Sequence, residues 1–253
     1  VIPGVTTLYR NLLAEILFLA PVPKVMRGYS FPGERRLRGD GRNISGVIKS
    51  LCEREGGRER LLAFIASLPE QNISGIDFAT TSRGEVMLRL VETFGGRERP
   101  VDAPVLADGT LRVLAVAAAI LTAPLGSMVV IEEIDNGVHP SRAHLLLRSI
   151  REVAAERRLR VLLTTHNPAL MDALPDAALG AVVFCYRDPE AGDSRLVRPA
   201  DLERAPSLLA QGSLGDLVTE GILDRFVKTR ATPEERKAKN RRWLEELEHA
   251  GEP

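Results

Sequence analysis

The sequence contains few of the residues and runs that mark extracellular, membrane or nucleic-acid-binding proteins. Cysteine occurs only twice in 253 residues, as Cys52 and Cys185, which is too few for a disulfide framework or a zinc-ligand set. Lysine plus arginine and aspartate plus glutamate both number 34, so the formal net charge is +0 and gives no global attraction to nucleic acid or to a membrane surface. We therefore expect a protein of a reducing, cytoplasmic compartment.

Long hydrophobic runs are also absent. The two most apolar windows, residues 12–22 and 111–131, are interrupted by charged residues, prolines or glycine. Neither reaches the roughly 20 apolar residues that a membrane span requires, so we expect no membrane partner. No basic segment precedes the first window, which does not fit a signal peptide. The sequence begins with Val1, which permits the interpretation that a front portion lies elsewhere.

Hydrophobic periodicity predicts an α/β fold with a parallel sheet, because helices and strands alternate in the second half of the chain. A loop rich in glycine and arginine is expected at residues 26–42, with Asn43 as a helix cap, and a polar connector at 95–104. A charged helical tail is expected from residue 228. The predicted helices span residues 8–20, 44–54, 58–67, 110–122, 141–157 and 214–227, and the predicted strands span 73–81, 85–94, 128–131, 160–164, 181–186 and 195–201.

One segment, MVVIEEIDNGVHP at residues 128–140, concentrates the polar chemistry. Its apolar start is typical of a buried strand, which places Glu132 and Glu133 at the strand tip. The next helix and strand predict a right-handed crossover with parallel strands, so His166 should emerge at the same sheet edge. Ligands bind at this edge. Two acids and an imidazole suit phosphoryl chemistry with Mg²⁺ and an activated water.

A second segment, LADGTLR at residues 106–112, predicts the start of a helix with a glycine at its mouth. Backbone N–H groups and the helix dipole at Gly109 and Thr110 can approach a phosphate. Asp108 fits an ordinary N-cap equally well. The order of the segments adds weight: a glycine loop, a helix, an acidic strand and a histidine loop.

This order resembles the nucleotide-binding domains of ABC-type ATPases, more closely the SMC-like and OLD-like stand-alone branch than the transporters. LADGTLR is similar to the signature loop, MVVIEE to the Walker B strand, IDNGVHP to the D-loop region and TTHNPALMD to the switch-histidine loop. GSLGDLVTEGIL is similar to a segment near the carboxyl end of many such ATPases. The resemblance covers about residues 40–227 and implies a P-loop NTPase-like core with a helical subdomain.

The resemblance also implies three regions and a set of residue roles. Residues 1–105 would be a signature-side helical subdomain with a β-hairpin, 106–227 the ATPase core, and 228–253 a charged tail. ATP and Mg²⁺ are the implied cofactors, with phosphate contacts made across a dimer. The implied roles are Glu132 for the magnesium side, Glu133 as catalytic base, His166 as γ-phosphate sensor, and Asp108, Gly109, Thr110, Asp135 and Asn136 for cofactor binding.

Two departures from the family pattern bear on these expectations. Ala107 stands where the signature loop usually has a serine, so one phosphate hydrogen bond is missing. The Walker A loop, GxxxxGK[ST], is absent. The nearest string, GRNISGVIKS at residues 41–50, has Lys49 too late and lacks a preceding buried strand. We therefore expect an incomplete N-terminal lobe.

Three functions remain open. The first is a dimeric ATPase of DNA repair or phage defence, completed by a Walker A from a missing segment or another chain, with an effector encoded alongside or DNA as possible further partners. The second is a scaffold or dimerisation module, against which Glu133 and His166 argue. The third is a metal-dependent nuclease built on Glu132, Glu133, Asp135 and His139.

Simpler interpretations stand beside these roles. The two glutamates fit a solvated strand end, and Asp135 and Asn136 fit an ordinary turn before Gly137. His139 fits a cap for the helix that starts near Ser141.

Overall fold

The computed structural model describes residue 7 and residues 9–10, 13–66, 72–202 and 212–228. The chain divides into two compact units, Val1–Leu174 and Pro175–Pro253. The predicted boundary at residues 105 and 106 falls inside the first unit. The predicted tail from residue 229 onward and part of the first predicted helix lie outside the described residues. Within the described residues, no helix combines the length and apolarity needed to cross a bilayer.

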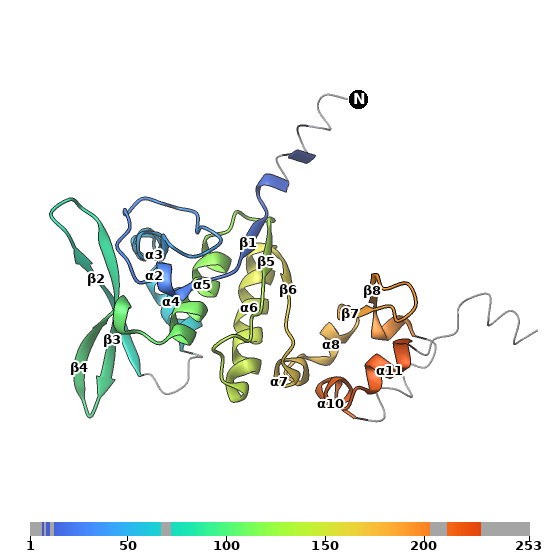
Figure 1. Ribbon diagram of the computed structural model, residues 1–253. Coiled ribbons are helices and arrows are strands. Elements are labelled where there is room, and N and C mark those ends of the chain that lie inside the picture. Colours follow the sequence, from blue (N-terminus) through green and yellow to red (C-terminus); the bar gives the residue numbers. More distant parts are fainter. Residues whose placement is uncertain (1–6, 8, 11–12, 67–71, 203–211, 229–253) are drawn as a thin grey trace, which may run out of the picture. The chain divides into compact units, whose positions relative to one another are not determined.

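A three-stranded parallel sheet carries the acidic segment (Figure 1). Its strands are β1 (Leu17–Leu19), β5 (Met128–Ile131) and β6 (Arg160–Leu163), in the order β1-β5-β6. Met128 faces Arg160 and Ile131 faces Leu163 across the β5–β6 pair. The predicted α/β class and the parallel pairing of β5 with β6 are therefore confirmed.

Strand β1 corrects the prediction of a helix over residues 8–20. Ala14 is helical, but Leu17–Leu19 pairs with β5, and the N–H of Glu132 donates to the carbonyl of Leu19 at 3.0 Å. A short LFL segment fits helical and extended periodicity equally well. Pairing with a strand more than 100 residues away decides between them, which local pattern does not reveal.

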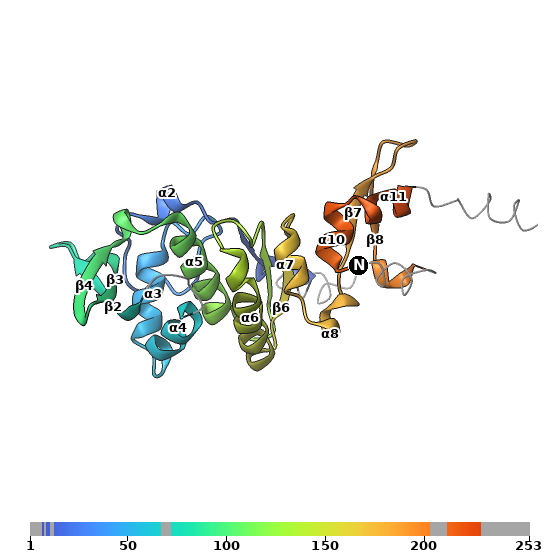
Figure 2. The ribbon, with the colours of Figure 1, turned by 90° about the horizontal axis from the view of Figure 1, so that it is seen from below.

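Helix α5 (Asp108–Thr122) is the central helix of the first unit's core. It is buried along almost its whole length, and its alanines at 115 and 117–119 are fully inaccessible to solvent. These small side chains let α5 contact the helices α3 (Ile44–Cys52), α4 (Gly57–Ile65) and α6 (Ala143–Arg157) together. Figure 2 shows these helices in a row. All four were predicted within a few residues of their observed ends.

A separate antiparallel sheet of the first unit has the order β2-β3-β4. The predicted hairpin is confirmed by β2 (Ile73–Thr80) and β3 (Val86–Phe94), and α3 packs against β3. The prediction of a polar connector over 95–104 is wrong, because β4 (Arg97–Asp102) pairs with β3. Strand β4 is mostly exposed, so its sequence shows no alternation of apolar and polar residues. It contains Pro100, which a sheet tolerates only on an edge strand.

Short elements complete the two units. In the first, α2 (Pro23–Met26), η1 (Ala103–Val105), η2 (Pro140–Arg142) and α7 (Pro168–Asp172) connect the longer elements. The second unit confirms the two predicted strands and the predicted pair of helices, around a small core of Leu202, Leu217, Leu223 and Val227. The antiparallel pairing of the two strands was not predicted. The elements of this unit are α8 (Asp176–Leu179), β7 (Phe184–Arg187), β8 (Ser194–Val197), η3 (Pro199–Asp201), α10 (Leu214–Thr219) and α11 (Ile222–Lys228).

Candidate functional site at the tip of the parallel sheet

The structure places Glu132 and Glu133 directly after β5, at the carboxyl edge of the sheet, and both are exposed. The backbone of Glu133 has φ 48°, in the left-handed region. This conformation costs a residue with a Cβ about 1–2 kcal/mol, so the surrounding contacts must hold it. Backbone strain of this kind gathers at binding and catalytic sites.

His166 lies beside this acidic loop, as the crossover predicts. The carboxylate within ion-pair range of its ring is that of Asp135, with Nε2 and Oδ2 3.9 Å apart, rather than a carboxylate of Glu132 or Glu133. The His166 side chain is 74% exposed, whereas that of Asp135 is 6% exposed. The imidazole is therefore accessible to a ligand from solvent, and the buried Asp135 is placed to orient it.

Two threonines bind the acidic loop to the tip of β6. Thr165 Oγ1 donates to Asp135 Oδ1 at 2.6 Å and also accepts the N–H of Asn167 at 3.0 Å. Thr164 Oγ1 accepts the strained backbone N–H of Glu133 at 3.0 Å. Sequence reasoning gave these threonines no role, although their position between a strand and His166 is the signal that could have found them.

Asn136 holds the Glu133 carboxylate in place. Its Nδ2 donates to Glu133 Oε2 at 2.5 Å, and its backbone N–H donates to the Glu133 carbonyl at 3.0 Å. The N–H of Val138 donates to the carbonyl of Asp135 at 3.0 Å. The turn expected before Gly137 is therefore present, and Asn136 also positions an acid.

The start of α5 touches the acidic loop. A Cβ added at Gly109 would lie 2.1 Å from the carbonyl oxygen of Gly137, and Gly137 itself has φ +81°. Only glycine fits both positions, since a side chain at either would meet backbone atoms. The close approach brings the predicted phosphate-facing helix and the predicted acidic site to the same place.

Helix α5 begins at Asp108, with Ala107 in the N-cap position and no side-chain cap hydrogen bond. The alternative in which Asp108 is the N-cap is therefore wrong. Thr110 is buried, with 5% exposure. Gly109 is half-buried and Asp108 is exposed. These three residues form the open end of the helix dipole.

Arg27 holds the segment that leads into α5. Its guanidinium pairs with Asp108, with Nη2 and Oδ1 2.5 Å apart, and Nη1 donates to the carbonyls of Ala103, Pro104 and Leu106 at 3.1, 2.8 and 2.7 Å. A sequence separation of 81 residues hides this contact from any local pattern. Arg27 therefore fixes the position of the helix mouth.

Other polar groups near the acidic loop have separate roles. His139 caps the segment before α6, because its Nδ1 accepts the N–H of Ser141 at 3.3 Å and lies 2.9 Å from Ser141 Oγ. This confirms its predicted structural role. A hollow of about 10 Å³, the room of one water molecule, is lined in part by Arg112, Glu132, Glu133 and Asn136. Among the described side chains, no three of histidine, cysteine, aspartate and glutamate gather closely enough to hold a metal.

Comparisons with known proteins place this geometry in a family. The family model described as "AAA domain, putative AbiEii toxin, Type IV TA system" matches residues 11–172, more than half of the chain. The chain therefore belongs to this family of AAA domains, and the predicted resemblance is confirmed. None of the curated proteins matches the sequence.

Solved structures of SMC ATPase heads are similar to the chain. One, from work on ATP-driven dimerisation and DNA-stimulated activation of SMC ATPases, has 14% identity and a TM-score of 0.42, with 61% of this chain and 89% of that chain covered. An SMC head bound to the C-terminal winged-helix domain of ScpA has 14% identity, a TM-score of 0.46 and coverages of 72% and 54%. The SMC head of Thermotoga maritima has 17% identity, a TM-score of 0.38 and coverages of 60% and 51%. This chain thus spans about half the length of the last two.

Proposed function

We propose that the chain is the signature, Walker B and switch-histidine part of an ATPase, which binds and hydrolyses ATP when a Walker A lobe completes it. The lobe would come from a segment outside this sequence or from another chain, and ATP would lie between two such domains in a dimer. Hydrolysis would open and close the dimer.

The observation that carries this proposal is a face of the parallel sheet that the described residues leave partly exposed. Phe18, Val130 and Leu162 lie side by side across the three strands; Phe18 and Leu162 on the outer strands are 62% and 49% exposed, and Val130 between them is 8% exposed. The opposite face is buried, with Val129 and Ile131 at 0% and 1% exposure. Parallel sheets almost always have both faces covered. An additional layer over this face would complete the sheet.

The outer edge of strand β6 is a second observation that supports the proposal. Within the described residues, β6 pairs only with β5, so its outer edge presents unpaired backbone groups. A further parallel strand on this edge and a helix on the partly exposed face would together form the strand–loop–helix unit that a Walker A requires. Such a unit would end beside His166, on the acidic side of the sheet.

Each exposed group at the tip of the sheet would then have its own role in ATP hydrolysis. Glu133, held by Asn136, would take a proton from the attacking water. His166, with Asp135 behind it, would donate to a phosphoryl oxygen. The backbone at Gly109 and Thr110 would face phosphate oxygens across the dimer, with Asp108 at the rim of the same helix mouth. The left-handed backbone of Glu133 supports a functional role, since the strain brings no evident structural gain.

The single carboxylate of Glu132 suits the way in which proteins usually bind Mg²⁺. Mg²⁺ is usually held by one or two protein carboxylates together with substrate phosphates and water. Glu132 is an exposed single carboxylate at the strand tip, and the described side chains form no larger ligand group. Bound there with ATP, the ion would offset charge on the phosphoryl oxygens.

The setting of this activity is proposed from resemblance. DNA repair or defence against phage is the usual setting of the branch, often with an effector encoded alongside, and the toxin named in the family model's description supports defence. Fold alone does not specify such a setting. Copurification of the full-length protein with the products of neighbouring genes would test it.

The test of the activity compares ATP turnover by this chain alone and together with a Walker A lobe. We expect turnover only with the lobe and a loss of about 10²-fold or more in Glu133→Gln, since a general base contributes about that much. Glu152→Gln, which removes an exposed carboxylate of α6, is the matched control and should keep full turnover. Turnover that survives Glu133→Gln would rule out this residue as the base.

Two other outcomes would support the competing functions. If the completed protein still fails to bind ATP, the scaffold or dimerisation module becomes the better explanation. Cleavage of DNA that requires a divalent metal but no nucleotide, and that Glu132→Gln abolishes, would favour the nuclease. His139 is one of the four residues of the nuclease hypothesis, and its Nδ1 already contacts Ser141 Oγ at 2.9 Å.

A further inference from the structure

The segment 24–43, which runs from within α2 to the start of α3, has more basic than acidic residues in a chain that is neutral overall. It contains six basic residues and two acidic ones, Glu34 and Asp40. Arg27, Arg38 and Arg42 are paired with carboxylates, and Lys24, Arg35 and Arg36 make up the surplus. Arg36 donates to the carbonyls of Ala14 and Ile16, which carry no charge to offset its own. The basic residues are Lys24, Arg27, Arg35, Arg36, Arg38 and Arg42. A local surplus of this size attracts an anionic partner even though the whole chain does not.

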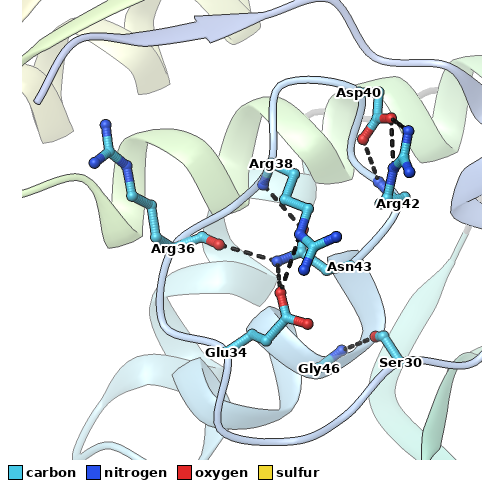
Figure 3. A network of polar contacts seen from close by, with 8 residues as sticks. All are labelled: Ser30, Glu34, Arg36, Arg38, Asp40, Arg42, Asn43 and Gly46. Carbon is cyan, nitrogen blue, oxygen red and sulfur yellow. Dashed lines mark hydrogen bonds and ion pairs between the residues drawn. The ribbon is translucent and has the colours of Figure 1, made fainter. Parts of the chain in front are cut away.

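The segment is held rigidly around the side chain of Asn43 (Figure 3). Asn43 is 2% exposed and accepts the N–H of Arg38 at 2.9 Å, while its Nδ2 donates to Glu34 and to the carbonyl of Arg36. It sits at the N-cap position of α3 but makes no cap hydrogen bond, so its predicted capping role is wrong. Its hydrogen bonds instead order the arginine-rich loop.

Further hydrogen bonds fasten both ends of this loop. The N–H groups of Ala20 and Val22 donate to the carbonyls of Gly39 and Asp40 at 2.9 and 3.0 Å. Ser30 Oγ accepts the N–H of Gly46 at 2.7 Å. A loop ordered in this way before a partner arrives loses little conformational entropy on binding.

The loop borders a hollow that combines aromatic rings with arginines. The hollow has a volume of about 400 Å³ and is lined by Val25, Tyr29, Ser30, Phe31, Glu34, Arg38, Arg42, Asn43 and Glu85. Tyr29 and Phe31 are 46% and 55% exposed. Two carboxylates also line the hollow. Glu34 is engaged by Asn43 and lies 3.5 Å from Arg38, and Glu85 accepts the hydroxyl of Thr81 at 3.5 Å.

From these features we infer that the hollow is a binding site for single-stranded nucleic acid. Bases would stack on Tyr29 and Phe31, and phosphates would pair with Arg38, whose side chain is 58% exposed and lies 3.5 Å from Glu34. Aromatic rings beside a basic group are the combination that non-specific single-strand binders use. Arg42 also lines the hollow, but its guanidinium is paired with Asp40 at 2.5 Å. An acidic peptide would supply the charge but no planar ring to stack. The hollow has room for one or two bases rather than for a double helix.

The test is fluorescence anisotropy with labelled oligothymidylate and oligouridylate, in the absence of ATP. We expect Phe31→Ala to raise Kd by about 5- to 100-fold, because stacking on an aromatic ring contributes this much per base. Arg38→Ala should lower the salt dependence of log K by about 0.7, because the protein would neutralise one phosphate fewer, and it keeps the backbone N–H that Asn43 accepts. The DNA and RNA strands together show whether the sugar matters.

The controls remove the same residue types elsewhere. Phe94→Ala removes an aromatic side chain with 53% exposure, and Arg148→Ala removes an arginine side chain with 70% exposure. Both should leave Kd unchanged, and equal melting temperatures would show that Phe31→Ala is folded.

Three results would overturn the inference: no binding by the native protein at low salt, an equal loss in the controls, or displacement of the strand by polyglutamate as readily as by unlabelled oligonucleotide. Duplex binding that Phe31→Ala does not affect would also contradict stacking. None of these results bears on the proposed ATPase, because nucleotide is left out.

Discussion

The hydrogen bond between Thr165 and Asp135 is shorter than the two that Thr164 makes with the acidic loop, at 3.0 and 3.1 Å. Its donor and acceptor oxygens are 2.6 Å apart, and the Asp135 side chain is 6% exposed. Thr165→Val removes the donor to Asp135 and also the acceptor of the Asn167 N–H, and the loss of the second bond cancels in the cycle. Asp135→Asn removes the charge and keeps the size. The two changes together form a double-mutant cycle for this bond.

The structure sets the expected size of each effect. A hydrogen bond to a charged group contributes about 1.5–3 kcal/mol, so Thr165→Val should lower the free energy of unfolding by about that amount. Asp135→Asn should cost less, about 1 kcal/mol, because the amide oxygen can still accept. The imidazole of His166 adds little, since it is 74% exposed and lies 3.9 Å away. The coupling energy should therefore be about 1–2 kcal/mol.

Urea unfolding followed by circular dichroism measures this coupling. The second unit is common to all four proteins, so its contribution cancels in the cycle. Thr122→Val is the matched control, because its hydroxyl donates to Ala118 within α5 and does not contact the acidic loop. We expect no coupling between Thr122→Val and Asp135→Asn. A coupling energy below about 0.5 kcal/mol between Thr165 and Asp135 would refute the view that this bond joins the two loops.

Three further predictions follow from other parts of the structure. Gly109→Ala should lower the free energy of unfolding by about 1–3 kcal/mol, because its Cβ would lie 2.1 Å from a carbonyl oxygen. Gly28→Ala, with nothing within 4 Å, should change it by about 0.5 kcal/mol or less, and equal urea midpoints would contradict the clash. The guanidinium of Arg42 holds the pKa of the Asp40 carboxyl below its ordinary value of 3.8. The contribution of Asp40 to stability is therefore complete above its pKa in the unfolded chain, and it is lost as the pH falls through its pKa in the folded protein. Urea midpoints measured between about pH 6 and about pH 3 should therefore fall less in Asp40→Asn than in the native protein, and parallel curves would contradict this. Burial raises the pKa of the Cys52 thiol, so a maleimide should label it at least about tenfold more slowly than the exposed Cys185, as single-cysteine variants would show; a faster Cys52 would contradict this.

Local pattern and chain handedness were enough to predict the centre of the candidate site. The apolar run before Glu132 marks a buried strand that ends at that residue, and the helix and strand after it can form only a right-handed parallel crossover. These two rules place His166 at the same edge as the acids without any knowledge of tertiary contacts. The alternation of helices and strands likewise predicts the α/β class.

The contacts that complete the site came only from the tertiary structure. Asp135, rather than Glu132 or Glu133, lies within ion-pair range of His166, because the turn held by Asn136 moves its carboxylate inward. Arg27 reaches Asp108 across 81 residues. Neither contact leaves a mark on local periodicity, since each depends on how distant segments pack.

The division between the two sources of knowledge has one physical reason. Periodicity reports which face of a segment is buried, and so it identifies the strand that ends before Glu132 and the helix that precedes this strand. It does not report which distant segment pairs with a short run, so strand β1 at Leu17–Leu19 and the edge strand β4 at Arg97–Asp102 appear only after folding. The sequence alone determined that Glu132, Glu133 and His166 share one edge of the sheet, where we propose that they act on phosphate. Only the tertiary structure decided how those residues are held, because the hydrogen bonds of Thr164 and Thr165 to the acidic loop join segments about 30 residues apart.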